Sequence, residues 1–279
     1  MKKRCKQTLI VSCFTAAVIA AISIISYVNW TKPYDLPKLD PELTINDFNL
    51  DFSLERETGS LQPGLTNNDL LAMVKQSPEN LVYSTELRLR MNRESQTEKF
   101  IDLMNEIEPT SDIVLQQALA YVDMLQDPDL GTAALGQKSV HSISLLEDIL
   151  QENPYDIPAH YARGLNNLYW PQGLKRADKA VQDFAFCIAV EQMNHELKFA
   201  FWPDIYAAFG DALVKAGDVS AGIAVWKEGY EKYPNDAALS QRAGADENTA
   251  YDIVKQERGI DGFKRPDPAI SDISKLWKG

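Results

Sequence analysis

The feature that most constrains the fold is a 34-residue segment, Pro203 to Asp236, in which small and large residues recur at helical spacing. Its members occupy fixed places in this frame: Tyr206, Leu213 and Trp226 at positions 4, 11 and 24, Gly210, Gly222 and Gly229 at positions 8, 20 and 27, and Pro234 at position 32. Gly217-Asp218 between the two halves is a turn signal. Small residues let two helices approach closely, and large ones fill the gap to the next pair. The segment therefore predicts two antiparallel helices that stack on similar units.

Three upstream segments carry the same pattern with decreasing regularity. Residues 157–190 keep Gly164 and Cys187 in phase after about four inserted residues near Trp170. The unit before it contains about 11 extra residues, 126–136, and residues 78–111 form a degenerate copy. Residues 237–257 follow as the polar capping helix that such a stack requires.

This pattern resembles the tetratricopeptide repeat (TPR) over roughly residues 78–257. The resemblance implies an all-α solenoid of helix-turn-helix repeats, which we expect over residues 69–257. It also implies a protein-binding scaffold, because the first helices of such repeats line a concave groove that holds peptides or partner helices. The resemblance is specific for the fold and names no activity.

The resemblance further implies which side chains face the groove: positions 2, 5, 9, 12 and 13 of each first helix. These positions hold Tyr161, Leu165, Leu168 and Tyr169, then Asp204, Ala207, Asp211, Val214 and Lys215, and in an earlier repeat Gln116, Ala120, Asp123 and Met124. The set is partly apolar and partly acidic, so the expected partner is a protein with a basic or amphipathic segment. The alternative is that the chain's own linker fills part of the groove.

Large aromatic residues interrupt the repeat spacing at two places. Trp170 precedes Pro171, and Phe201 and Trp202 precede Pro203. Such residues either anchor a partner at an interface or cover irregular gaps between repeats. The tail, residues 258–279, ends in Leu276-Trp277 and either docks on a partner or folds back.

The amino end predicts a membrane anchor. Residues 8–28 carry no charge and are long enough to span a bilayer, the stub of residues 1–7 holds four basic residues, and Trp30 lies where interfacial aromatics belong. The positive-inside rule places the stub in the cytoplasm and the repeats outside. A cleaved signal peptide, or a lipoprotein processed at Cys13, are the alternatives.

Residues 29–68 predict an extended Pro/Asp-rich linker between anchor and repeats. Within it, Phe48, Leu50, Phe52 and Leu54 alternate with polar residues, the period of a strand with one apolar face. This strand either packs along its own domain or adds to a partner's sheet edge.

Charge argues against nucleic acid as a ligand. The chain has 28 basic and 40 acidic residues, a net charge of −12. The first 30 residues hold four of the bases and no acid, so the remainder holds 24 against 40, or −16. A body this acidic repels phosphate backbones.

No pattern in the chain predicts catalysis, a cofactor or a metal. Gly131, Gly136 and Lys138 resemble a phosphate-binding loop, but Gln137 separates the second glycine from the lysine. His195-Glu196 lacks the second histidine of a zinc-peptidase helix. His160 falls at a packing position, and Cys187 is expected to be a buried small apolar residue.

Together these patterns predict a single-pass protein of the bacterial inner membrane, with its repeats in the periplasm, that acts as a scaffold or assembly factor. A permanent structural subunit of a membrane enzyme complex is the alternative, and a small-ligand-binding or hydrolytic domain is a further one.

Overall fold

The computed structural model describes residues 28, 30–194 and 196–278. It divides into two compact units, and the second, residues 35–279, is called the body below. Regular structure in the body is helical, and no strand occurs in the part of the chain that is described. The predicted stub and nearly all of the predicted anchor lie outside the described residues. Within those residues, none of the helices is long and apolar enough to cross a membrane.

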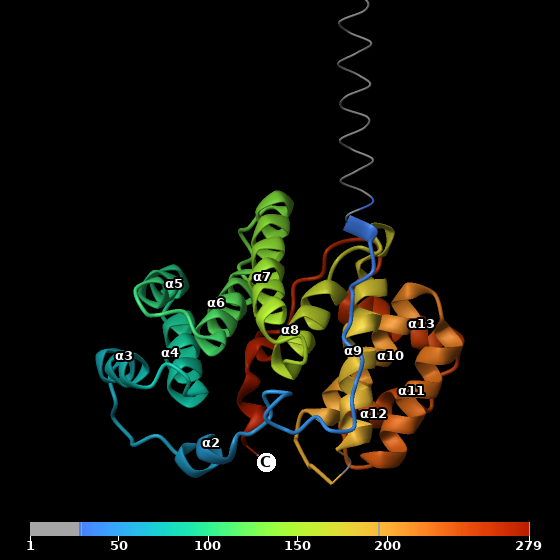
Figure 1. Cartoon of the computed structure of the whole chain (residues 1–279). Coiled ribbons are helices and arrows are strands. Elements are labelled where there is room, and N and C mark those ends of the chain that lie inside the picture. Colours follow the sequence, from blue (N-terminus) through green and yellow to red (C-terminus); the bar gives the residue numbers. More distant parts are fainter. Residues whose placement is uncertain (1–27, 29, 195, 279) are drawn as a thin grey trace, which may run out of the picture. The chain divides into compact units, whose positions relative to one another are not determined.

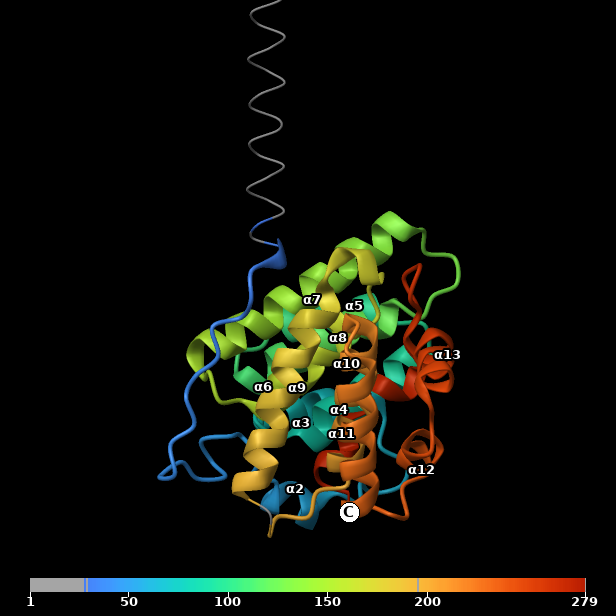
Figure 2. The ribbon, with the colours of Figure 1, turned by 90° about the vertical axis from the view of Figure 1, so that its right-hand side faces the viewer.

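The helices follow one another along the whole body (Figures 1 and 2). The α-helices are α2 (Ser53–Thr58), α3 (Asn67–Gln76), α4 (Leu81–Arg93), α5 (Thr97–Asn105), α6 (Ser111–Met124), α7 (Thr132–Glu152), α8 (Ile157–Leu168), α9 (Arg176–Met193), α10 (Trp202–Ala216), α11 (Val219–Lys232), α12 (Ala237–Ala243) and α13 (Glu247–Arg258). Short 3₁₀ helices are η1 (Gln172–Leu174), η2 (Pro268–Ser271) and η3 (Ile273–Leu276).

Helices α4 to α11 form consecutive pairs, α4/α5, α6/α7, α8/α9 and α10/α11. The two members of each pair pack together, and each second helix also packs on the first helix of the next unit. Successive first helices, α4, α6, α8 and α10, contact one another. This is the stacking that the repeat pattern predicts, and α12 and α13 cover its carboxyl end.

Local signals in the sequence set the helix ends. Asp156 accepts a hydrogen bond from the Ala159 amide (2.7 Å) at the start of α8, and Asp236 caps α12 in the same way. Such caps satisfy amides that have no partner inside the helix. Gly217, at φ 107°, ends α10 in the left-handed conformation that favours glycine.

The glycines of the α10/α11 pair are where the two helices come closest. A Cβ atom on Gly210 would lie 2.2 Å from Nε1 of Trp226, and one on Gly222 would lie 2.7 Å from the Gly210 carbonyl oxygen. Trp226 is fully buried and donates to the Ala207 carbonyl (3.1 Å). The small and large positions therefore play the predicted packing roles. Gly164 against Phe184 repeats the arrangement in α8/α9, at 2.8 Å.

The insertion at residues 126–136 is partly helical, because its second half belongs to the start of α7. Gly131 is the N-cap of α7, so the helix already contains Thr132 to Gly136. The segment that resembles a phosphate-binding loop thus forms the first turns of a 21-residue helix.

The segment predicted to be an extended linker belongs to the body from Asp35 onward. Phe48, Leu50 and Phe52 are buried in the main core, whereas Leu54 is exposed in α2. The strand prediction is wrong, because a turn closes here: the Leu50 amide donates to the Ile45 carbonyl (2.9 Å). Of the two alternatives for this segment, packing on its own domain is the one observed.

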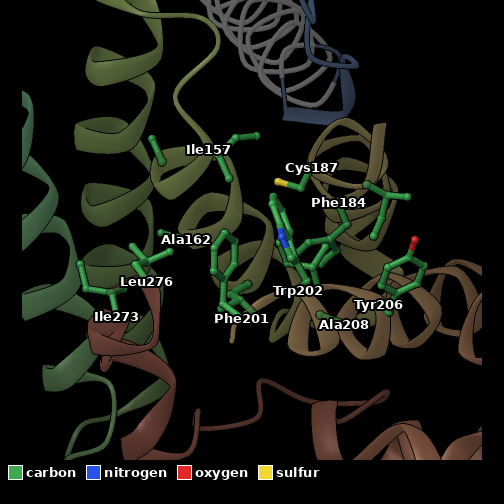
Figure 3. Close-up of a cluster of buried hydrophobic side chains, with 14 of the residues drawn as sticks. Ile157, Ala162, Phe184, Cys187, Phe201, Trp202, Tyr206, Ala208, Ile273 and Leu276 are labelled. Carbon is green, nitrogen blue, oxygen red and sulfur yellow. The ribbon is translucent and has the colours of Figure 1, made fainter. Parts of the chain in front are cut away.

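The carboxyl-terminal tail, defined here as residues 259–278, folds back on the body. It contacts α6 through η2 and α4 through η3. Ile273 and Leu276 are buried, and Figure 3 shows them beside Ala162 and Phe201. The same apolar cluster contains Cys187, which is fully buried as predicted.

Candidate functional site

The candidate site is the face of α4, α6, α8 and α10 that the tail covers, called the inner face below. A hollow of about 480 Å³ remains between this face and the tail. Its walls come from α8, α10, α12, α13 and the tail. The first helices thus share one face, and the chain's own carboxyl end lies on it.

Five of the ten predicted partner-binding residues line this hollow: Tyr161, Leu165, Tyr169, Phe201 and Asp204. The other five, which are Leu168, Trp170, Trp202, Asp211 and Lys215, are buried and do not line it. Asp211 and Lys215 are fully buried, so they do not face an open groove. The repeat rule takes no account of α12 and α13, which supply the arginines and the carbonyl oxygen around these two residues.

The two aromatic insertions cover gaps between repeats. Trp170 donates from Nε1 to Ser139 Oγ (2.8 Å), and its ring packs edge-on against Phe263 of the tail, with centroids 5.5 Å apart. Trp202 donates to the Leu197 carbonyl (3.1 Å) and packs on Phe201. Both are buried, so neither offers an accessible anchor for a partner in this conformation.

Asp211 is the centre of a buried ion-pair cluster. It accepts from Nε of Arg242 and Nε of Arg258, each at 2.8 Å. Burial alone would raise the pKa of Asp211, but Arg258 and Arg242 outweigh it and the pKa lies below its usual value. This acid, predicted to attract a basic partner, is already neutralised by α12 and α13.

Lys215 lies nearby and donates to backbone oxygens. Its Nζ binds the carbonyl oxygens of Leu168 (2.8 Å) and Arg258 (2.9 Å). Burial, and then the neighbouring Arg258 charge, lower the pKa of Lys215 to about 7. The residue ties α10 to the ends of α8 and α13.

A second polar cluster holds the tail against α4 and α6. Arg88 pairs with Asp123, and both side chains are fully buried. Arg88 also donates from Nε to Gln116 (2.8 Å) and from Nη2 to the Ser271 carbonyl, while the Ser271 hydroxyl donates to Asp123. The pair therefore contacts both the backbone and the side chain of one tail residue.

Two cations of the tail and two backbone hydrogen bonds add further polar contacts, the latter from the Lys264 amide to the Tyr169 carbonyl (3.1 Å) and from the Gln172 amide to the Ile260 carbonyl (2.9 Å). Arg265 donates to four carbonyl oxygens just after α6, those of Leu125 (3.1 Å), Asp127, Pro128 (3.1 Å) and Leu130 (2.8 Å). A helix carboxyl end carries partial negative charge, which favours a cation there. Lys275 pairs with Asp204 of α10 at 2.7 Å.

The apolar end of the tail packs against the segment that precedes α2. Trp277 lies beside Phe52, with ring centroids 6.3 Å apart. Its ring is buried, yet Nε1 has no hydrogen-bond acceptor among the described residues. Burying a donor without an acceptor costs about 1–3 kcal/mol.

The described residues give no positive sign of a reaction centre. No group of three or more His, Cys, Asp or Glu side chains in the described part could hold a metal ion. His160 is buried, with its ring nitrogens 2.8 Å from Asp183 Oδ1 and 3.0 Å from the Pro154 carbonyl oxygen, which fits the predicted packing role.

Several residues of the site are not singled out by the sequence pattern. These are Arg88, Arg265, Ser271 and Lys275. One signal was available: Arg265 and Lys275 are ten residues apart and Leu276-Trp277 follows, a composition that complements an acidic and apolar face.

Comparisons with known proteins bear on the fold alone. No protein-family model matches the chain, and no curated protein matches it. Among solved structures, it is similar to a thermophilic TPR protein of Thermus thermophilus, with 17% identity, a TM-score of 0.49, and coverage of 71% of this chain and 95% of that one. The repeat architecture therefore rests on the helix pairing and the glycine contacts of the body itself.

Proposed function

We propose that this protein is a membrane-anchored helical scaffold that binds partner proteins on the inner face of its repeats. One observation carries the proposal: the inner face already binds a peptide segment, the tail, in cis. It contacts the segment's backbone through Arg88 and its cations through Asp204 and the carboxyl end of α6. A surface of this chemistry suits a basic or amphipathic segment of another protein.

The membrane part of the proposal comes from the amino end. The uncharged run of residues 8–28, with basic residues on one side only, supports a single span with the body outside the cytoplasm, in the bacterial periplasm. An anchored body shares the membrane surface with its partners, which raises their effective concentration. The mechanism is binding alone.

Crosslinking from the inner face tests the binding role. A photoreactive residue at Glu257 of α13, which is exposed and lines the hollow without belonging to the tail, is expected to capture a membrane-associated protein in intact membranes. The same probe at Lys227, exposed on α11, is the matched control and is expected to capture less of it. Equal capture from both positions would contradict binding at the inner face.

Topology is tested separately. A reporter that is active only outside the cytoplasm, fused after Gly279, is expected to be active, and deletion of residues 1–28 is expected to release the body from membranes. Activity of a cytoplasm-only reporter would overturn the orientation without bearing on the inner face.

A further inference from the structure

The tail contacts the inner face with groups that a segment of another chain could supply equally well. Its contacts are a backbone carbonyl and a hydroxyl at Ser271, a guanidinium at Arg265, an ammonium at Lys275 and the apolar side chains that follow. None of these groups requires covalent continuity with α13. The tail therefore binds the inner face as a separate peptide of the same sequence could.

We propose that the inner face is an exchangeable peptide site: the tail occupies it in the resting protein, and a partner's segment of matching chemistry displaces the tail. This inference rests on the proposed scaffold function and deepens it by defining the partner. The partner's segment carries an arginine about six residues before a serine or threonine, a lysine about four after it, and bulky apolar residues directly beyond the lysine.

Each element of that description follows from one contact. The arginine is needed because the four carbonyl oxygens after α6 form a cluster of acceptors, all bound by the Arg265 guanidinium. The hydroxyl is needed because Asp123 accepts from it while Arg88 binds the adjoining carbonyl. The lysine pairs with Asp204. The apolar end fills the place of Leu276, which lies in one cluster with Phe201 (Figure 3), and of Trp277, which packs beside Phe52.

The cis complex has features that make exchange feasible. The Lys275–Asp204 pair is open to solvent, with 59% and 28% of the two side chains exposed, so it contributes little to stability. Trp277 buries its indole N–H without an acceptor among the described residues, which opposes docking of the tail. A hollow of about 480 Å³ also remains under the tail, so its fit to the face is incomplete. A ligand that satisfies more of these groups would compete with the tail.

Peptide exchange on the full chain in mild detergent tests the proposal. The probe is a synthetic peptide of residues 261–278 with a fluorophore at its amino end, and binding is followed by fluorescence anisotropy. The variant Arg265→Ala/Ser271→Ala weakens the cis tail and leaves the inner face unchanged. We expect it to bind the probe at least about tenfold more tightly than the wild type, because the site is vacant for a larger fraction of the time.

A milder variant and a control accompany it. Lys275→Ala removes only the exposed ion pair with Asp204, so it replaces the double variant if that variant does not fold. It is also expected to bind the probe more tightly than the wild type. Lys278→Ala is the control, because Lys278 is exposed and donates to Ser274 through its backbone amide, which the substitution keeps. It is expected to match the wild type.

Charge reversal then identifies the binding surface. In the tail-weakened background, Asp204→Lys is expected to reduce probe affinity about tenfold, and a probe carrying Lys275→Asp is expected to recover most of the loss. A variant that is only misfolded would not be rescued by a complementary probe.

Three results would overturn the proposal: equal affinity in the wild type and both tail variants, no probe binding in any of them, or no effect of the charge reversal. Stable dimers of the tail-weakened chain, detected by light scattering, would assign the site to a second copy and also contradict a partner's segment. If crosslinking at Glu257 captures the same protein equally well with and without the tail substitutions, the scaffold function stands and the displacement fails.

Discussion

Different kinds of contact hold the α10/α11 pair together and hold the tail on the inner face. In the pair, backbones approach so closely that Gly210 and Gly222 have no room for a Cβ atom. At the tail, charged and polar side chains such as Arg88 and Asp123 span the gap between elements that are 148 residues apart along the chain. The first interface depends on shape, and the second depends on hydrogen bonds between charged and neutral groups, one exposed ion pair and buried apolar side chains.

This difference suggests two separate roles for the two interfaces, one in stabilising the fold and one in binding. Close helix contacts at glycines tolerate almost no substitution, because a Cβ atom added there would clash with backbone or with a buried ring. Hydrogen bonds and ion pairs can be formed equally well by another chain that presents the same groups. The α10/α11 pair is therefore suited to fixing the fold, and the inner face is suited to exchanging a ligand.

Removing one half of the buried ion pair is expected to give the largest effect. Arg88→Met leaves Asp123 charged and buried without its partner, which we expect to lower the free energy of unfolding by about 3–5 kcal/mol. Urea unfolding followed by circular dichroism measures the loss. The double variant Arg88→Met/Asp123→Leu is expected to recover most of it, because an apolar pair can replace a buried ion pair. A double variant as unstable as the single one would show that the charges fix this interface in a way that packing cannot replace.

The second largest loss of stability is expected when a methyl group is added where α10 and α11 are in closest contact, at Gly210. In Gly210→Ala the new methyl would lie 2.2 Å from Trp226 and 2.8 Å from the Gly222 carbonyl oxygen. Overpacking of this kind costs about 1–3 kcal/mol and exceeds the helix propensity gained. Gly136→Ala is the matched control within α7, because its nearest neighbour, Trp170, would be 3.5 Å away. The control is expected to be neutral or more stable by up to about 1 kcal/mol, and a larger loss in the control than in Gly210→Ala would contradict the packing account.

The same contrast explains how much the sequence could predict. The α10/α11 pair lies within 34 consecutive residues, so Gly210, Gly222 and Trp226 appear as a local period. The pairing of α4 to α9 follows the same period despite the insertions. Local spacing is enough where the partners of a contact belong to neighbouring turns.

The inner face could not be predicted in the same way. The repeat positions predict that Asp123 faces the groove, but they do not identify Arg88 as its partner, and no period links either residue to Ser271 of the tail. Asp211 and Lys215 fall at positions that face the groove in a bare stack, but here α12 and α13 supply partners for them. For the segment before α2, alternation identified Phe48, Leu50 and Phe52 as apolar neighbours but gave the wrong backbone, because period 2 does not distinguish a strand from a turn with buried side chains.

A pH series would sharpen the comparison by measuring two acids that, unlike Asp123, are not paired with an arginine among the described residues: Asp112, which is partly buried, and Asp156, which is buried. Burial first, and then Asp156 and Glu55, raise the pKa of Asp112 to about 7; burial also raises the pKa of Asp156 to about 6. Both values exceed those of an unfolded chain, so the folded protein binds more protons between about pH 4 and 7 and loses stability as pH rises through that range. Urea midpoints at pH 5 and pH 7 are expected to show this fall.

Asp112→Asn is expected to reduce the fall, because it removes one of the two carboxyl groups that must ionise. Asp148→Asn, at an exposed position of α7, is the control and is expected to keep it. Lys215 acts in the opposite sense at higher pH, since its lowered pKa of about 7 makes stability rise as pH increases above that value. A wild-type midpoint that does not fall from pH 5 to pH 7 would contradict the assignment to Asp112 and Asp156.

The smallest effect on stability is expected at the solvent-exposed end of the tail interface. Lys275→Ala removes a pair with Asp204 whose side chains are 59% and 28% exposed, and such pairs contribute at most about 1 kcal/mol. Global urea unfolding should therefore change little. Hydrogen exchange at the amides of Ser271 to Trp277 should accelerate, because the tail can detach without unfolding the helix pairs. If exchange there slows or stays unchanged while the whole body loses more than about 2 kcal/mol, the tail is part of the same cooperative unit as α10/α11, and the division between a fixed fold and an exchangeable ligand does not hold.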